Sequence, residues 1–166
     1  MKTERDVMEV GSQWYNRIDS EISQYTISSG NREVKKYKLD RLLRVARRVD
    51  DFSQTCDECR TYQKEIEGLV QELDMLFQRP DRQQHRKYTK TVFNITEHLK
   101  KIHKLVDKGH YIGIGISIGM ALGAGIGAAL GAAFDNPGVG TGVGLALGAA
   151  AGVYLDRKAR EESRVI

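Results

Sequence analysis

Charge is almost absent from the last third of this sequence of 166 residues. Residues 111–155 contain no Lys, Arg or Glu and a single Asp, Asp135. The rest is rich in charge, so the averages over the whole chain, 40% hydrophobic residues and a mean hydropathy of -0.45, describe neither part. The sequence therefore divides into a polar domain at 1–110, an uncharged segment at 111–155 and a charged tail at 156–166.

Sequence signals of several common function classes are also missing. The start, MKTERDVMEV, is charged from its second residue and holds no apolar core or lipid-attachment Cys, so we expect no secretory export. Strings such as GxGxxG occur, but with no predicted strand before them, and no Gly-Lys-Ser or Gly-Lys-Thr is present, which excludes dinucleotide and phosphate loops. No Ser/His/Asp or paired-carboxylate constellation stands out. We therefore expect no enzymatic activity.

Glycine fills the uncharged segment at a regular spacing. It recurs at every fourth position in two runs, Gly115, Gly119, Gly123, Gly127 and Gly131, then Gly140, Gly144, Gly148 and Gly152. Positions four apart share one helix face, so each run predicts a helix with one surface of bare backbone. Glycine costs a helix in water up to about 1 kcal/mol relative to alanine, but in a membrane small residues allow close helix packing. We interpret the runs as two glycine zippers that form helix contacts.

Segment length and flanking charge predict a transmembrane helical hairpin. The first apolar segment, 111–134, exceeds the roughly 20 residues that span a bilayer, and the second, 139–155, is slightly short. The sequence DNPG at 135–138 predicts a turn between them. Basic residues precede the first segment and follow the second, which places both termini in the cytoplasm. A buried soluble hairpin is the alternative.

The C-terminal third resembles a known group of proteins. Its segments GIGISIGMALGAGIGAALGAAF, DNPG and GVGLALGAAAG, with the end LDRKAREESRVI, are similar to the poorly characterised prokaryotic glycine-zipper membrane proteins. In those proteins a doubled zipper ends in a charged tail rich in lysine or arginine. The resemblance implies a membrane hairpin that self-associates as a homo-oligomer, and it implies no activity. The sequence departs from exported glycine-zipper lipoproteins and surface antigens, because it lacks a signal peptide and a lipobox.

Residues 1–110 show helical periodicity throughout, which predicts an all-α fold with an N-terminal three-helix, coiled-coil-like bundle. A first helix ends near SSGN at 28–31, and a breaker segment, RPDRQQHRK at 79–87, separates a second helix from an antiparallel third. The expected inward positions are Val7, Val10, Trp14, Ile18 and Ile22, then Leu42, Val45, Val49, Phe52, Cys56, Cys59, Gln63, Ile66, Val70, Leu73 and Phe77, then Tyr88, Val92, Ile95, Leu99, Ile102 and Val106.

The motif CDEC, with Cys56 and Cys59, leaves three interpretations open. Both cysteines fall on the apolar seam, where a free cysteine serves as a small hydrophobe and no cofactor is needed. Folding the helix pair about its breaker would instead bring them near His103 and His110, which makes Cys56, Cys59 and His103 candidate zinc ligands. The two histidines are about two helical turns apart, too far to share one ion easily, and we expect His98 and His103 to be solvated or half-buried beside the seam. Redox chemistry, the third interpretation, favours CxxC at an exposed helix start after a strand.

Basic residues are concentrated between Arg32 and Asp50, where eight Lys or Arg stand against three acidic residues. A solvated helix face is the simplest interpretation. Beside a membrane such a face would attract anionic lipid headgroups, at about 1 kcal/mol for each cation near the surface. The candidates for this contact are Lys35, Lys36, Arg44, Arg47 and Arg48. We expect no nucleic-acid partner, because no recognition fold or group of stacking aromatics accompanies these residues.

These observations favour a membrane-anchored helical protein that self-associates through its hairpin, as an oligomer or a pore, with a cytoplasmic regulatory bundle. One alternative is a soluble or peripheral helical adaptor whose hairpin packs in an oligomer or on a partner. A third is a thiol or zinc sensor that uses Cys56 and Cys59.

Overall fold

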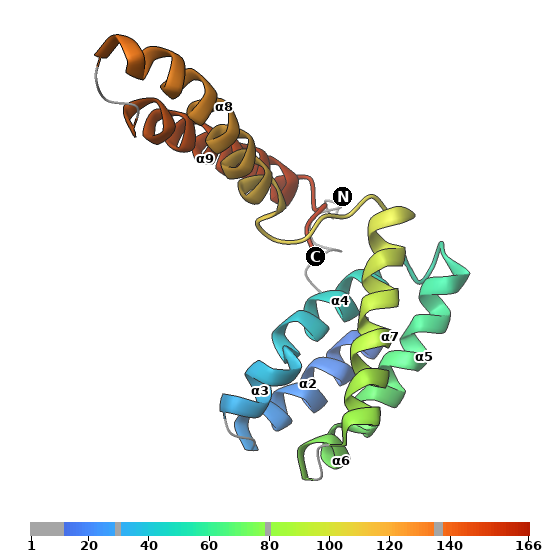
Figure 1. Ribbon diagram of the computed structural model, residues 1–166. Coiled ribbons are helices and arrows are strands. Elements are labelled where there is room, and N and C mark those ends of the chain that lie inside the picture. The colour runs from blue at the N-terminus through green and yellow to red at the C-terminus, as the bar shows by residue number, and fades with distance from the viewer. Residues whose placement is uncertain (1–11, 29–30, 79–80, 135–137) are drawn as a thin grey trace. The chain divides into compact units, whose positions relative to one another are not determined.

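The structure, a computed structural model, describes residues 12–28, 31–78, 81–134 and 138–166 (Figure 1). These residues form α-helices without any named strand, which confirms the predicted all-α class. The helices are α2 (Gln13–Ser28), α3 (Asn31–Tyr37), α4 (Leu39–Phe52), α5 (Asp57–Gln71), α6 (Leu73–Gln78), α7 (Arg82–Lys101), α8 (His110–Phe134) and α9 (Gly138–Glu161). They belong to two compact units, one that ends at His103 and one that runs from Lys104 to Ile166.

Helix α4 is central to the first unit, because it contacts α2, α5 and α7 (Figure 1). Its buried side chains recur at spacings of three and four, so one stripe of the helix faces its neighbours. The largest fully buried side chains are Ile18 and Ile22 of α2, Leu39, Leu42, Val45 and Val49 of α4, Ile66 and Val70 of α5, Leu73 and Leu76 of α6, and Ile95 and Leu99 of α7. All of these positions except Leu39 and Leu76 were predicted to point inward. Val7 and Val10 lie outside the described residues.

The predicted second helix is wrong in one respect, because it is not continuous from Leu42 to Phe77. Helix α4 ends at Phe52 and α5 begins at Asp57, and the two helices contact each other. The Ser53 hydroxyl donates to the Asp50 carbonyl oxygen at 2.8 Å, a local bond that competes with helix propagation. The break lets α4 and α5 bury their apolar stripes against each other. The bundle therefore contains more helices than the three that periodicity predicted.

The end of α7 also differs from the prediction. The helix stops at Lys101, so the apolar period that continued to Ile102 and Val106 is interrupted. Ile102 is 61% exposed rather than buried. The chain leaves the bundle here, with Lys104 in the left-handed region at a φ of 56°.

The second unit is built on direct contact between α8 and α9. A methyl group added at Gly115 would lie 2.2 Å from the Gly148 carbonyl oxygen, and one at Gly119 would lie 2.3 Å from the Gly144 carbonyl oxygen. The other contacts of this kind join Gly123 to Gly144, and Gly152 to Tyr111 and Ile112. The surroundings of Gly127, Gly131 and Gly140 lie outside what the structure describes. The glycine faces thus bring two backbones together within one chain.

Helix α9 continues to Glu161, through most of the segment that the sequence assigned to a separate tail at 156–166. Its Asp156 is buried and accepts a hydrogen bond from the Tyr111 backbone N–H at 3.0 Å, which satisfies one free donor at the start of α8. In the parts of the chain that the structure describes, no helix is both long enough and apolar enough to cross a membrane.

Candidate metal centre

Four potential metal ligands converge where α5 begins and α7 ends. Cys56 is the residue before α5 and has an extended backbone, and Cys59 lies in the first turn of that helix. His98 lies in the last turn of α7, and His103 follows two residues after its end. Because α5 and α7 pack against each other, residues about 40 positions apart in sequence meet at one end of the bundle.

The distances between these side chains are short. His98 Nε2 lies 3.4 Å from Cys56 Sγ and 3.5 Å from Cys59 Sγ, and His103 Nε2 lies 3.3 Å from Cys59 Sγ. All four ligand atoms lie within 4.8 Å of one another. The two sulfurs and two imidazole nitrogens therefore surround one point.

A tetrahedral zinc ion would fit this arrangement. With Zn–S near 2.3 Å and Zn–N near 2.0 Å, neighbouring sulfur and nitrogen ligands at a tetrahedral angle are about 3.5 Å apart. The three sulfur-to-nitrogen distances of 3.3 to 3.5 Å match that spacing. A set of two thiolates and two imidazoles is a common zinc ligand set, and it is soft enough to disfavour Mg²⁺ or Ca²⁺.

The histidine rings are oriented by further contacts. His98 Nδ1 lies 2.5 Å from Glu58 Oε2, so the carboxylate holds the proton on Nδ1 and leaves Nε2 free to face the sulfurs. The His103 ring stacks on Phe52, with centroids 3.9 Å apart and planes 17° from parallel. A carboxylate behind a ligating histidine is the usual outer support of a zinc site.

Burial shifts the pKa of two of the four side chains. It raises the pKa of the Cys59 thiol to about 12, with smaller contributions from Cys56 and Glu58. Burial also lowers the pKa of His103, and the nearby His98 ring adds to that shift. A thiol with a raised pKa is a poor nucleophile, which disfavours a redox role for Cys59. Cys56 lies half-buried directly before α5, at the kind of helix start that the redox interpretation requires. Neutral imidazole is the form that binds metals.

The sequence pattern indicated three of these four residues. The structure brings Cys56, Cys59 and His103 together, and it adds His98, which the pattern predicted to be solvated or half-buried. His98 is only 8% exposed. The available signal was the spacing His-x₄-His, which with Cys-x₂-Cys is typical of zinc sites, although the segment between the two pairs is longer here than in a zinc finger. His110 begins α8 and belongs to the other unit.

The candidate headgroup residues are largely occupied within the bundle. Arg44 forms an ion pair with Asp40 at 3.1 Å, and Arg48 forms one with Asp51 at 3.0 Å. The Arg47 guanidinium lies over the Tyr15 ring at 5.9 Å from its centroid. Lys35 and Lys36 lie in the last turn of the short helix α3. Exposed pairs of this kind contribute little stability, and contact of these residues with lipid headgroups stays a prediction.

Comparisons of the chain with protein-family models, with curated proteins and with solved structures found no match. The function of the chain is therefore inferred from the geometry of its described residues.

Proposed function

We propose that this protein is a zinc-binding helical protein in which the ion joins the start of α5 to the end of α7. The observation that carries the proposal is the convergence of Cys56, Cys59, His98 and His103, whose ligand atoms lie within 4.8 Å of one another. Four protein ligands complete a tetrahedral zinc sphere and leave no position for a substrate or a reactive water. The proposed role is thus structural or sensory, and not catalytic.

Zinc binding would change the order of one segment of the bundle. Binding requires deprotonation of both thiols, so zinc uptake releases protons and becomes tighter as pH rises. His103 lies beyond the end of α7, where its backbone N–H still donates to the Leu99 carbonyl oxygen at 3.2 Å, and its ligation would fix the segment that follows. A change in zinc level or oxidation of the thiols would therefore change the order of this segment.

The test is metal binding by the reduced, full-length protein. We expect one equivalent of zinc after dialysis, and a cobalt(II) complex with the absorption of a tetrahedral site that has sulfur ligands. Cys59→Ser and His98→Ala should each weaken binding by more than the roughly 10- to 100-fold that the loss of an outer-shell contact costs. His110→Ala is the matched control and should bind normally. Retention of full affinity by His98→Ala, or no bound metal in the wild type, would contradict the proposal.

We also propose that the α8–α9 hairpin associates with a membrane and that both termini face the cytoplasm. Its support is the distribution of side chains. The described glycines at every fourth position contact the partner helix, whereas Ile118, Leu122 and Leu147 are 54%, 61% and 67% exposed. An apolar outer surface of this kind favours contact with lipid or another apolar partner. In this proposal the glycines close the hairpin, and homo-oligomer contacts would use the outer faces.

Alkaline carbonate extraction of membranes tests this second function, with a known spanning protein as the standard. We expect the full-length chain to stay in the pellet with the standard. A Leu122→Lys and Leu147→Lys double variant should shift to the supernatant, because a charge inside a bilayer costs about 2.5–3.5 kcal/mol on insertion scales. The variant should still bind zinc, so the two functions fail separately. Release of the wild type would refute membrane association.

A further inference from the structure

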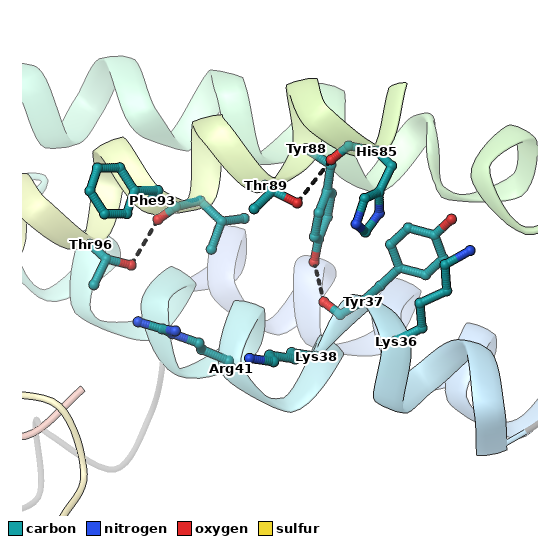
Figure 2. A pocket seen from close by; sticks show the side chains of 10 residues that line it. Lys36, Tyr37, Lys38, Arg41, His85, Tyr88, Thr89, Phe93 and Thr96 are labelled. Atoms are coloured by element: carbon teal, nitrogen blue, oxygen red, sulfur yellow. Dashed lines mark hydrogen bonds between the residues drawn. The ribbon is translucent and has the colours of Figure 1, made fainter. Parts of the chain in front are cut away.

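A cavity of ≈ 290 Å³ lies between the junction of α3 with α4 and the first half of α7 (Figure 2). One wall contributes Lys36, Lys38 and Arg41, and the other contributes His85, Tyr88 and Phe93. This volume is close to the lower end of the roughly 300–1,000 Å³ of small-molecule sites. The cavity belongs to the first unit, and none of the four proposed metal ligands lines it.

The lining is strongly basic. None of the residues described as lining this cavity is acidic, whereas three are Lys or Arg. An adjoining cavity of ≈ 250 Å³ shares Lys36 and His85 and adds Arg82, Arg86 and Asp81. Asp81 is already used as the cap of α7, where its side chain accepts from the Gln84 backbone N–H at 3.3 Å. A cavity with this charge attracts anions.

His85 carries a polar atom that the bundle does not use. Its Nδ1 is buried and has no hydrogen-bond partner among the described residues. The ring is held edge-on to Tyr37, with centroids 5.3 Å apart. A buried nitrogen without a partner is uncommon and costs free energy unless something outside the protein satisfies it.

Lys38 occupies an unfavourable backbone conformation at the cavity wall. Its φ of 49° and ψ of 50° lie in the left-handed region, which side chains other than glycine rarely adopt. Glycine would accept this turn between α3 and α4 without strain, yet a lysine occupies it and lines the cavity. Strained positions of this kind cluster at binding sites.

Aromatic rings come from both walls of the cavity. Tyr37 and Tyr88 meet edge to face at 5.7 Å, and the Tyr88 hydroxyl donates to the Tyr37 carbonyl oxygen at 2.9 Å (Figure 2). Both tyrosines are buried, which holds their rings in place. Phe93, in contrast, is 61% exposed. The combination favours a ligand with a small apolar body and one concentrated negative group.

We propose that this cavity binds a phosphate monoester. Arg41, Lys36 and Lys38 would hold the phosphate oxygens, because a guanidinium and two ammonium groups more than neutralise a dianion and supply N–H donors to its oxygens. The His85 ring lines the same space, and the tyrosine and phenylalanine rings would contact the ester group. The same phosphate chemistry occurs in soluble metabolites and in the headgroup of phosphatidic acid, which the experiment distinguishes.

The experiment titrates full-length protein with phenyl phosphate, and separately with phosphatidylcholine vesicles that contain phosphatidic acid. Lys36→Gln and Arg41→Gln should each weaken binding about 10-fold or more, since each removes a charge-assisted hydrogen bond. Lys90→Gln is the matched control: it removes the same charge from an exposed position of α7 outside the cavity, and its affinity should stay within about twofold of wild type.

Lys38→Gly separates binding from folding. This variant should raise the melting temperature, because glycine relieves the left-handed strain, and it should nevertheless weaken binding. Binding of phenyl phosphate that is weakened in Lys36→Gln, Arg41→Gln and Lys38→Gly, but not in Lys90→Gln, supports a soluble ligand. Binding of the vesicles alone, with the same losses, assigns the phosphate to a lipid headgroup. Absence of binding to both probes, or an equal loss in Lys90→Gln, overturns the proposal.

Discussion

Two alanine substitutions on α8 should change the stability of the hairpin in opposite directions. At Gly119, an added Cβ would lie 2.3 Å from the Gly144 carbonyl oxygen and 3.0 Å from the Gly148 Cα. At Gly125, no described atom lies within 4 Å of an added Cβ. The chemical change is the same, and both sites are inside the same helix. The two variants therefore differ only in what the new methyl group meets.

The expected magnitudes depend on those distances. Alanine favours a helix over glycine by about 0.5–1 kcal/mol, so Gly125→Ala should stabilise the hairpin by that amount. The same gain applies at Gly119, but the contact there is about 1 Å shorter than ordinary van der Waals contact at 3.4 Å. Both atoms belong to the backbone, so the helices must separate, and overpacking of this kind costs about 1–3 kcal/mol. Gly119→Ala should therefore destabilise the hairpin by about 1–2 kcal/mol.

Hydrogen exchange of the full-length protein measures both effects where they occur. Amides of residues 110–125 should exchange about 5- to 30-fold faster in Gly119→Ala and up to about fivefold slower in Gly125→Ala, because exchange follows local opening. On α9, Gly148→Ala and Gly142→Ala form an equivalent pair. If Gly119→Ala slowed exchange as much as Gly125→Ala, the backbones of α8 and α9 would not be in contact, and the interpretation of the glycine spacing would be refuted.

Two further predictions concern the bundle. Burial raises the pKa of Tyr88, so the stability that the neutral hydroxyl contributes is complete below the ordinary tyrosine pKa of about 10 and is lost as pH rises through the folded value. Tyr88→Phe should lower the free energy of unfolding by about 1–3 kcal/mol at neutral pH, because it leaves the Tyr37 carbonyl unpaired. In denaturant unfolding, the stability of this variant should decline less than that of the wild type above about pH 10. An equally steep alkaline decline in the variant would contradict this. Glu58→Gln should lower zinc affinity by about 10- to 100-fold, whereas Glu65→Gln, an exposed control on the same helix, should leave it unchanged. Competition with a zinc indicator measures both affinities. Equal losses in the two variants would show that the Glu58 contact with His98 does not matter.

Helical periodicity predicted the core of the bundle but not its topology. The positions of Leu42, Ile66 and Ile95 on apolar stripes were sufficient to predict their burial, because each helix must bury one face. The reversal at 53–56 could not be predicted from the same pattern, since the apolar spacing continues through it. The reversal depends on a local bond of Ser53 and on the gain from packing α4 against α5, which is a property of the folded chain.

The metal centre was partly predicted for a related reason. The sequence placed His103 near Cys59, but it paired Cys56 with His110, because its pattern indicated one continuous helix before the breaker and one after it. The early end of α7 and the break before α5 change this register, and His98 takes the place of His110. The basic cavity could not have been predicted at all. Its two walls, around Lys38 and His85, are brought together only by the packing of α4 on α7.

The chemistry of the cluster also bears on the kind of sensor it would be. Without metal, Cys59 keeps its proton because burial raises its pKa to about 12, and sulfur-to-nitrogen contacts satisfy the polar atoms. With Zn²⁺, two thiolates and two neutral imidazoles again give a centre without net charge. Burial therefore opposes neither the metal-free nor the zinc-bound form of the cluster strongly. A zinc finger differs, because it has almost no other core and unfolds without its metal. Here Leu99 and Ile66 remain buried in a helical core next to the site, so loss of the ion should loosen the Cys56 and His103 segments while the bundle persists.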